Sequence, residues 1–148
     1  MKKEIIEFGR RMDAAEDKKT LVEYAEGATN VLDLGAGTGK IARDIASAYG
    51  AHVDTVDIQF KDNCTDSDNV SYYGMSIADF LKTFAGTKKY DCIVLSAILH
   101  ELGNEDIQLL QIYLPEVMMT NCRILIREPF YDSVLGPVLK KMLKNLLN

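Results

Sequence analysis

The sequence lacks the features that mark secreted, membrane-spanning and metal-binding chains. No apolar run approaches the roughly 20 residues needed to cross a membrane, and the amino terminus has no apolar core of the signal-peptide type. Cys64, Cys92 and Cys122 are widely spaced and form no Cys-x-x-Cys pair. They predict reduced thiols rather than a disulfide framework or a zinc site. We therefore expect a cytoplasmic protein with no membrane partner and no bound metal.

Excess positive charge is also missing. The chain has 17 Lys and Arg against 22 Asp and Glu, for a net charge of −5. This balance gives no global attraction to nucleic acid, although a local basic face remains possible. At 148 residues with 47% apolar side chains, the chain predicts one domain with a single substantial core.

What the sequence does have is a glycine-rich stretch over residues 31–42, Val-Leu-Asp-Leu-Gly-Ala-Gly-Thr-Gly-Lys-Ile-Ala. Apolar residues around Asp33 predict a short buried strand, and a helical pattern starts at Lys40. Between them, Gly35, Gly37 and Gly39 allow a turn without β-carbons. A strand, a glycine turn and a helix bring bare backbone close to a nucleoside ligand in α/β domains.

The spacing of these glycines excludes two phosphate-binding motifs. The dinucleotide fingerprint needs its third glycine three places after the second, where this chain has Lys40. The P-loop needs a glycine at the position of Leu34 and a Ser or Thr at the position of Ile41. An ordinary Gly-rich turn between strand and helix remains the plain alternative.

The spacing that does fit is Asp-x-Gly-x-Gly-x-Gly, which resembles motif I of the class I S-adenosylmethionine-dependent methyltransferases. Their ligand carries an ammonium, a carboxylate and a sulfonium but no phosphate. A carboxylate such as Asp33 beside the loop is therefore electrostatically favourable, whereas it would repel a pyrophosphate.

A second acidic residue stands where a ribose-binding carboxylate is expected. Asp57 is the next-to-last residue of the predicted strand 51–58 and lies 20 residues after Gly37, about the spacing found in nucleoside-binding folds. One carboxylate can accept hydrogen bonds from both ribose hydroxyls, and the resemblance gives Asp57 that role. Strand alternation turns Asp54 to the other face and makes it a weaker candidate.

The resemblance extends to two later segments. Family members often have an acidic residue at the position of Ser76, where it accepts a hydrogen bond from the adenine amino group, so the hydroxyl here weakens that contact. Ser76 to Asp79 also has the spacing of a helix capping box. After the predicted strand 90–96, a Leu-His pair places His100 near the ligand, either as a general base or as a packing residue.

The resemblance assigns cofactor binding to Asp33, Gly35, Ala36, Gly37, Gly39, Asp57, Ile58, Ser76, Ile77 and Ser96, and catalysis to His100.

Five predicted strands alternate with helices, which predicts an α/β fold with a mostly parallel sheet and helices on both faces. The resemblance makes this a Rossmann-like three-layer sandwich that lacks the last two strands usual in the family. We expect a helical segment over 1–27, a cofactor-binding core over 28–130 and an amphipathic helix over 131–148. With the fifth strand, 123–128, left at the sheet edge, a homodimer through that strand and the last helix is one prediction. A fragment of a longer protein and a monomer capped by the helix are the others.

The resemblance implies an S-adenosylmethionine-dependent methyltransferase, with S-adenosylhomocysteine as its product and a small molecule as the expected acceptor. A ligand-binding module or partner subunit without activity is the alternative, favoured by the short chain and by Ser76. RNA or protein methylation is a third hypothesis. The net charge and the absence of an Asn-Pro-Pro-Tyr-like motif after Leu95 argue against a nucleic-acid acceptor.

Overall fold

Parallel strands make up the centre of the molecule. In the computed structural model, six strands form one sheet in the order β1-β6-β5-β2-β3-β4, and every pairing is parallel. The strands are β1 (Glu4–Phe8), β2 (Asn30–Leu34), β3 (His52–Asp57), β4 (Val70–Gly74), β5 (Tyr90–Ser96) and β6 (Met118–Arg127). The structure describes residues 4–8, 14–35, 37–60, 65–67, 69–96, 98–127, 141 and 144–145, with the backbone alone for 4–8, 14–17 and 100.

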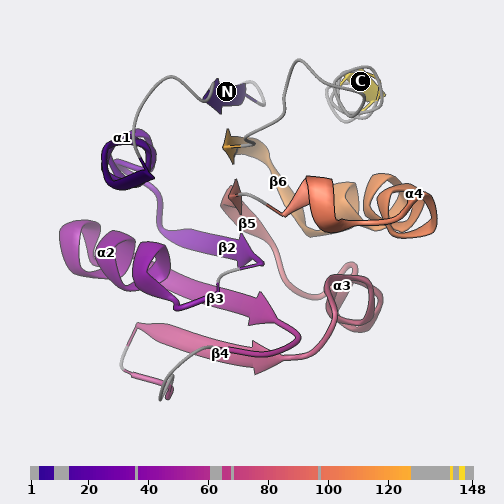
Figure 1. Cartoon of the computed structure of the whole chain (residues 1–148), viewed down its shortest axis with the longest axis horizontal. Coiled ribbons are helices and arrows are strands. Elements are labelled where there is room, and N and C mark those ends of the chain that lie inside the picture. Colours follow the sequence, from indigo (N-terminus) through magenta and orange to yellow (C-terminus); the bar gives the residue numbers. More distant parts are fainter. Residues whose placement is uncertain are drawn as a thin grey trace.

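Helices cover both faces of the sheet (Figure 1). Helices α1 (Ala14–Tyr24) and α2 (Lys40–Tyr49) pack on one face, and α3 (Ile77–Phe84) and α4 (Asn104–Tyr113) pack on the other. Two short 3-10 turns, η1 (Leu99–Glu101) and η2 (Leu114–Val117), precede and follow α4. The predicted α/β sandwich with helices on both faces is therefore confirmed. No helix in the described part of the chain has both the length and the apolar character to cross a membrane.

The core lies in two layers, one on each side of the sheet. Residues of β2 and β5 contribute to both layers, so their apolar runs are buried on both faces. This is the usual state of central strands in a parallel sheet covered on both sides. The first amphipathic helix after the glycine turn, α2, buries Ile41, Ala42, Ile45 and Ala46 against one face. These layers fix the strand ends from which the site is built.

The amino-terminal segment corrects the prediction of helix throughout residues 1–27. Residues 4–8, Glu-Ile-Ile-Glu-Phe, form the strand β1, which pairs with β6 in the register Ile5 to Ile124 and Ile6 to Leu125. A short apolar segment is compatible with a helix or a strand. Here the pairing with β6, which is distant in the sequence, makes the segment a strand. The helix α1 follows as expected and ends three residues before Gly27.

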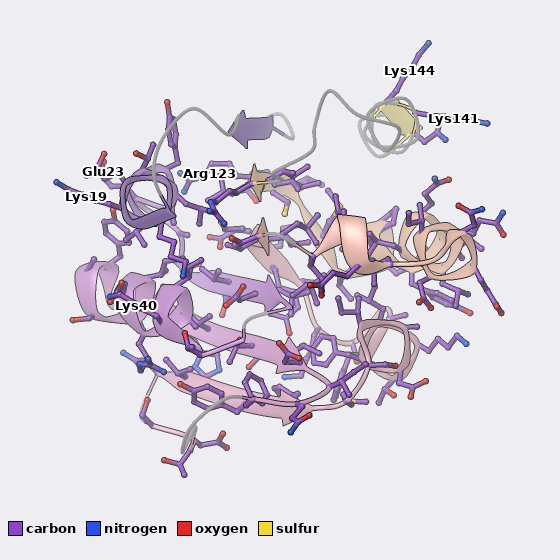
Figure 2. All side chains as sticks on the ribbon, viewed as in Figure 1. Lys19, Glu23, Lys40, Arg123, Lys141 and Lys144 are labelled. Atoms are coloured by element: carbon purple, nitrogen blue, oxygen red, sulfur yellow. The ribbon has the colours of Figure 1, made fainter. Side chains whose placement is uncertain are left out.

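The prediction that the fifth strand forms a sheet edge is wrong for the same reason. That strand is β6, and it lies between β1 and β5. The exposed edge that argued for a homodimer is therefore filled by β1, and the dimer itself stays a prediction. The predicted helix over 131–148 lies mostly outside the described residues. Lys141 and Lys144, which are described there, are exposed and point away from the sheet (Figure 2).

Arg123 joins β6 to α1 (Figure 2). One guanidinium nitrogen donates to the Tyr24 carbonyl at 2.6 Å, and the other donates to the Glu26 carbonyl at 2.7 Å. These carbonyls lie at the carboxyl end of α1, where backbone acceptors lack partners within the helix and a cation is favourable. The contact fixes α1 beside the strand that ends at the site.

Candidate ligand-binding site

The site lies where the strand order reverses. Strand β2 is central, and the chain leaves it toward β3 on one side and returns beside it as β5 on the other. Ligands of open α/β sheets bind at the carboxyl ends of the strands at such a point. Here those ends are Leu34, Asp57 and Ser96.

All three glycines of the loop between β2 and α2 have positive φ, and two of them, Gly35 and Gly37, line the site. Gly35 has φ 78°, and its N–H donates to the Val56 carbonyl at 2.8 Å. A β-carbon at Gly35 would lie 2.6 Å from the Ile98 side chain, so only glycine fits beneath Ile98. Gly37 has φ 60°, and a β-carbon there would meet no atom within 4 Å. The loop is thus packed at Gly35 and open at Gly37.

Asp57 holds this loop from the end of β3. Its Oδ2 accepts a hydrogen bond from the Gly37 N–H at 2.7 Å, and its Oδ1 accepts one from the Gln59 N–H at 3.2 Å. The two oxygens of a carboxylate offer about four acceptor sites in total. Asp57 can therefore keep both backbone donors and still accept from two hydroxyl groups of a ligand.

Two adjoining cavities open at this edge of the sheet, and they share the lining residues Gly35, Asp57, Ile98 and Glu101. The apolar cavity has a volume of about 220 Å³ and the polar cavity a volume of about 410 Å³. The remaining lining of the apolar cavity is Ile58, Ser76, Ile77, Ala78, Leu81, Leu102, Asp106 and Leu110. The remaining lining of the polar cavity is Lys18, Asp33, Gly37, Thr38, Lys40, Ile41, Gln59, Ser96 and Arg127.

Asp33 is the buried acid of the polar cavity. The residue is 1% exposed, and the Thr55 hydroxyl donates to its Oδ2 at 3.3 Å. The pKa of Asp33 is raised to about 7, mainly by burial. The hydrogen bond from Thr55 lowers this pKa, and the negative charge of Asp57 raises it. Near neutral pH this carboxyl group is therefore divided between its protonated and ionised forms.

The structure brings most of the predicted site residues together. Asp33, Gly35, Gly37, Asp57, Ile58, Ser76, Ile77 and Ser96 all line one or both cavities. Gly39 lines neither cavity. It is buried at the start of α2, where a β-carbon would lie 2.8 Å from the Tyr72 ring. Ala36 and the side chain of His100 lie outside the described residues, so their roles stay predictions.

Ser76 has the capping role that its spacing predicts. It is the N-cap of α3, and its Oγ accepts a hydrogen bond from the Asp79 N–H at 3.1 Å. Asp79 is exposed and lines neither cavity. Ser76 therefore contacts the apolar cavity with a hydroxyl that already accepts one bond.

Asp54 lies outside both cavities, as the alternation along its strand predicts. Its Oδ2 accepts a hydrogen bond from the Tyr90 hydroxyl at 2.6 Å and lies 3.3 Å from Lys88 Nζ. Burial, together with this bond and the charge of Asp54, raises the pKa of Tyr90. His52 Nε2 is 3.4 Å from Asp54 Oδ1, an oxygen that has no hydrogen-bond partner among the described residues.

Sequence reasoning missed several residues of the site. Glu101 lines both cavities, and Asp106 lines the apolar one. The position of Glu101 just after β5, at the edge where ligands collect, was an available signal. Asp106 offered none, because an acid in the first turn of a helix is explained by the helix dipole alone.

No family model matches the sequence, and no curated protein matches it. Among solved structures, a protein from Streptococcus mutans assigned as a SAM-dependent methyltransferase is 20% identical with a TM-score of 0.68, over 90% of this chain and 39% of that one. SMU.776, assigned as a methyltransferase and solved with S-adenosylhomocysteine, is 18% identical with a TM-score of 0.66, over 92% of this chain and 40% of that one. A SAM-dependent methyltransferase from Archaeoglobus fulgidus is 23% identical with a TM-score of 0.63, over 93% of this chain and 70% of that one.

These likenesses show that the chain has the fold of the S-adenosylmethionine-dependent methyltransferases. The chain spans about two fifths of the first two of these structures. At these identities the shared property is the fold, and a fold alone does not determine the chemistry of its site.

Proposed function

We propose that this chain binds S-adenosylmethionine and transfers its methyl group to an acceptor, for which a small molecule is the simplest class. The observation that carries the proposal is the pair of joined cavities with the Asp57 carboxylate at their junction. One end of the site is apolar, its middle offers a carboxylate, and its other end is polar and charged. This is the order of the base, the ribose diol and the amino-acid end in the ligand.

The residues present fit that ligand part by part. The apolar cavity offers Ile58, Ile77 and Leu81 to the faces of a base. Asp57 can accept from both hydroxyls of a ribose, as charge-assisted hydrogen bonds. The open position at Gly37 leaves room for the ligand close to the backbone.

The polar cavity has charges of both signs for a zwitterion. Asp33 and Glu101 can face an ammonium or sulfonium, and Lys18 and Arg127 can face a carboxylate. A cation placed near Asp33 favours the ionised carboxylate and therefore lowers the pKa of Asp33. Binding should then release a proton, and affinity should rise as the pH is raised through 7.

When bound, S-adenosylmethionine supplies a methyl group that the positive sulfur has already activated. The protein then has to hold its ligand and the acceptor in line, and such positioning can supply much of a rate enhancement. Asp57 and the glycine loop orient the ligand. His100, in η1 beside the junction residue Glu101, remains the predicted base for an acceptor that must lose a proton.

A pair of glycine variants tests the binding site. Gly37→Ala and Gly50→Ala both place a methyl group at a positive φ, 60° and 66°, where no atom lies within 4 Å. Each should lose about 1–2 kcal/mol of stability from the left-handed backbone. Of these two glycines, only Gly37 lines the polar cavity. Gly37→Ala should therefore weaken binding of S-adenosylhomocysteine by about tenfold or more, and Gly50→Ala should not.

Isothermal titration calorimetry with S-adenosylmethionine and S-adenosylhomocysteine gives the readout. Wild-type protein that binds neither ligand would refute the proposed function. Equal weakening in both variants would assign the loss to general destabilisation. Transfer of label from methyl-labelled S-adenosylmethionine into metabolite, RNA or protein extracts then identifies the acceptor class, and binding without transfer would favour a ligand-binding module.

A further inference from the structure

The apolar cavity contains one carboxylate with no assigned role, that of Asp106. Asp57 and Glu101 line both cavities and so lie at their junction, whereas Asp106 lines the apolar cavity alone. It belongs to the first turn of α4 and stands one turn before Leu110, which lines the same cavity. Residues four apart share a helix face, so the packing of α4 on the sheet brings both residues to the cavity.

The chemistry of a base in this cavity requires an acceptor that Ser76 supplies poorly. The 6-amino group of adenine is a hydrogen-bond donor with no acceptor capacity at its nitrogen. Ser76 Oγ already accepts from the Asp79 N–H at 3.1 Å, and its proton is better placed to donate to a ring nitrogen. The other described lining residues that reach only this cavity are apolar, apart from Asp106.

The Asp106 carboxylate is available for such a contact. It is exposed to the cavity and solvent, and it has no hydrogen bond or ion pair with another residue in the described part of the chain. By contrast, the neighbouring Glu105 is also exposed on α4 but lines neither cavity. The two acids therefore differ in position while sharing a helix turn.

We propose that Asp106 accepts the hydrogen bond from the adenine 6-amino group and sets the preference of the site for a 6-aminopurine. The inference rests on the proposed function and deepens it, because it names the residue that recognises the base. A ligand with a 6-oxo group would place a carbonyl oxygen against the carboxylate in place of the 6-amino donor, and its nearest remaining donor, the N1–H, lies at a different position on the ring. Sites built around a hydrogen bond to the ligand discriminate strongly against analogues that lack it.

The test compares S-adenosylhomocysteine with its 6-oxo analogue, S-inosylhomocysteine, by isothermal titration calorimetry. Wild-type protein should bind the 6-amino ligand about tenfold more tightly or better. Asp106→Ala should lose about that factor in affinity for the 6-amino ligand and most of the preference. Asp106→Asn, whose amide can also donate to a carbonyl, should narrow the preference by improving binding of the 6-oxo analogue.

Glu105→Ala is the matched control and should leave both affinities unchanged. Because both side chains are exposed, neither variant should perturb folding, and thermal unfolding of each protein verifies this. If wild-type protein binds S-adenosylhomocysteine while Asp106→Ala retains its affinity and its preference, this inference is overturned and the proposed function stands. If wild-type protein binds neither ligand, the proposed function and this inference fail together.

Discussion

The buried carboxyl group of Asp33 makes a quantitative prediction about stability. Its pKa in the folded protein is about 7, against 3.8 for the same group in solvent. Between these two values the folded protein holds a proton that the unfolded chain has released. Stability must therefore fall as the pH rises through this range, because the unfolded state is the one that ionises more readily.

The size of the effect follows from the difference in pKa. About three pKa units correspond to about 4 kcal/mol, at about 1.4 kcal/mol for each unit. The free energy of unfolding should fall by close to about 1.4 kcal/mol for each pH unit between about pH 4.5 and 6.5. This dependence should vanish above about pH 8, where Asp33 is ionised in both the folded and the unfolded state. Asp33→Asn removes the titration and keeps an oxygen that can accept from the Thr55 hydroxyl.

Urea unfolding of the wild-type protein and of Asp33→Asn at several pH values between 5 and 8 isolates this group, since other titrations cancel in the difference. The variant should gain stability relative to wild type as the pH rises, by a few kcal/mol in total. Asp44→Asn is a suitable control because the Asp44 side chain is 44% exposed and forms a surface ion pair with Lys40. The stability difference between this variant and wild type should vary with pH by no more than about 0.5 kcal/mol. A flat difference for Asp33→Asn would refute the assignment of a buried, protonatable acid beneath the loop.

Three further outcomes are expected. Asp57→Ala should weaken S-adenosylhomocysteine binding by about 1.5–3 kcal/mol in calorimetry, since a charged hydrogen-bond acceptor is lost; unchanged affinity would remove Asp57 from the ligand. His100→Ala should lower methyl transfer about a hundredfold with cofactor affinity unchanged, and unchanged turnover would give His100 a packing role. Tyr90→Phe should cost about 1–3 kcal/mol in urea unfolding because it leaves Asp54 Oδ2 without its hydroxyl donor, and a cost near zero would contradict the importance of that bond.

The parts of the site predicted from sequence are those specified by local patterns. The strand, glycine turn and helix over 30–49 follow one another within a few residues, and the acid that ends the next strand is found by its spacing. The cap at Ser76 is likewise a local signal, because its partner is three residues away. Each of these features could be assigned without knowing how distant segments pack.

What the sequence did not disclose depends on packing between distant segments. The strand β1 is defined by its pairing with β6, which no local pattern near residue 4 reveals. Asp106 reaches the apolar cavity only because Ile107 and Leu110 anchor α4 in the core on that face. The closeness of Ile98 to Gly35 likewise depends on the return of the chain beside β2.

The pairing of β1 with β6 also has a consequence for the order of folding. Almost the whole described chain separates these two strands, and β6 is the sole neighbour of β1 in the described sheet. Closing so long a loop costs entropy before the contact repays it, so β1 should join the sheet late, after the other five strands have assembled. Until then β6 presents unpaired backbone groups that favour association with other chains. Among the strands, β1 should accordingly show the fastest amide hydrogen exchange. Aggregation during refolding should begin from the species in which β1 has not yet paired with β6.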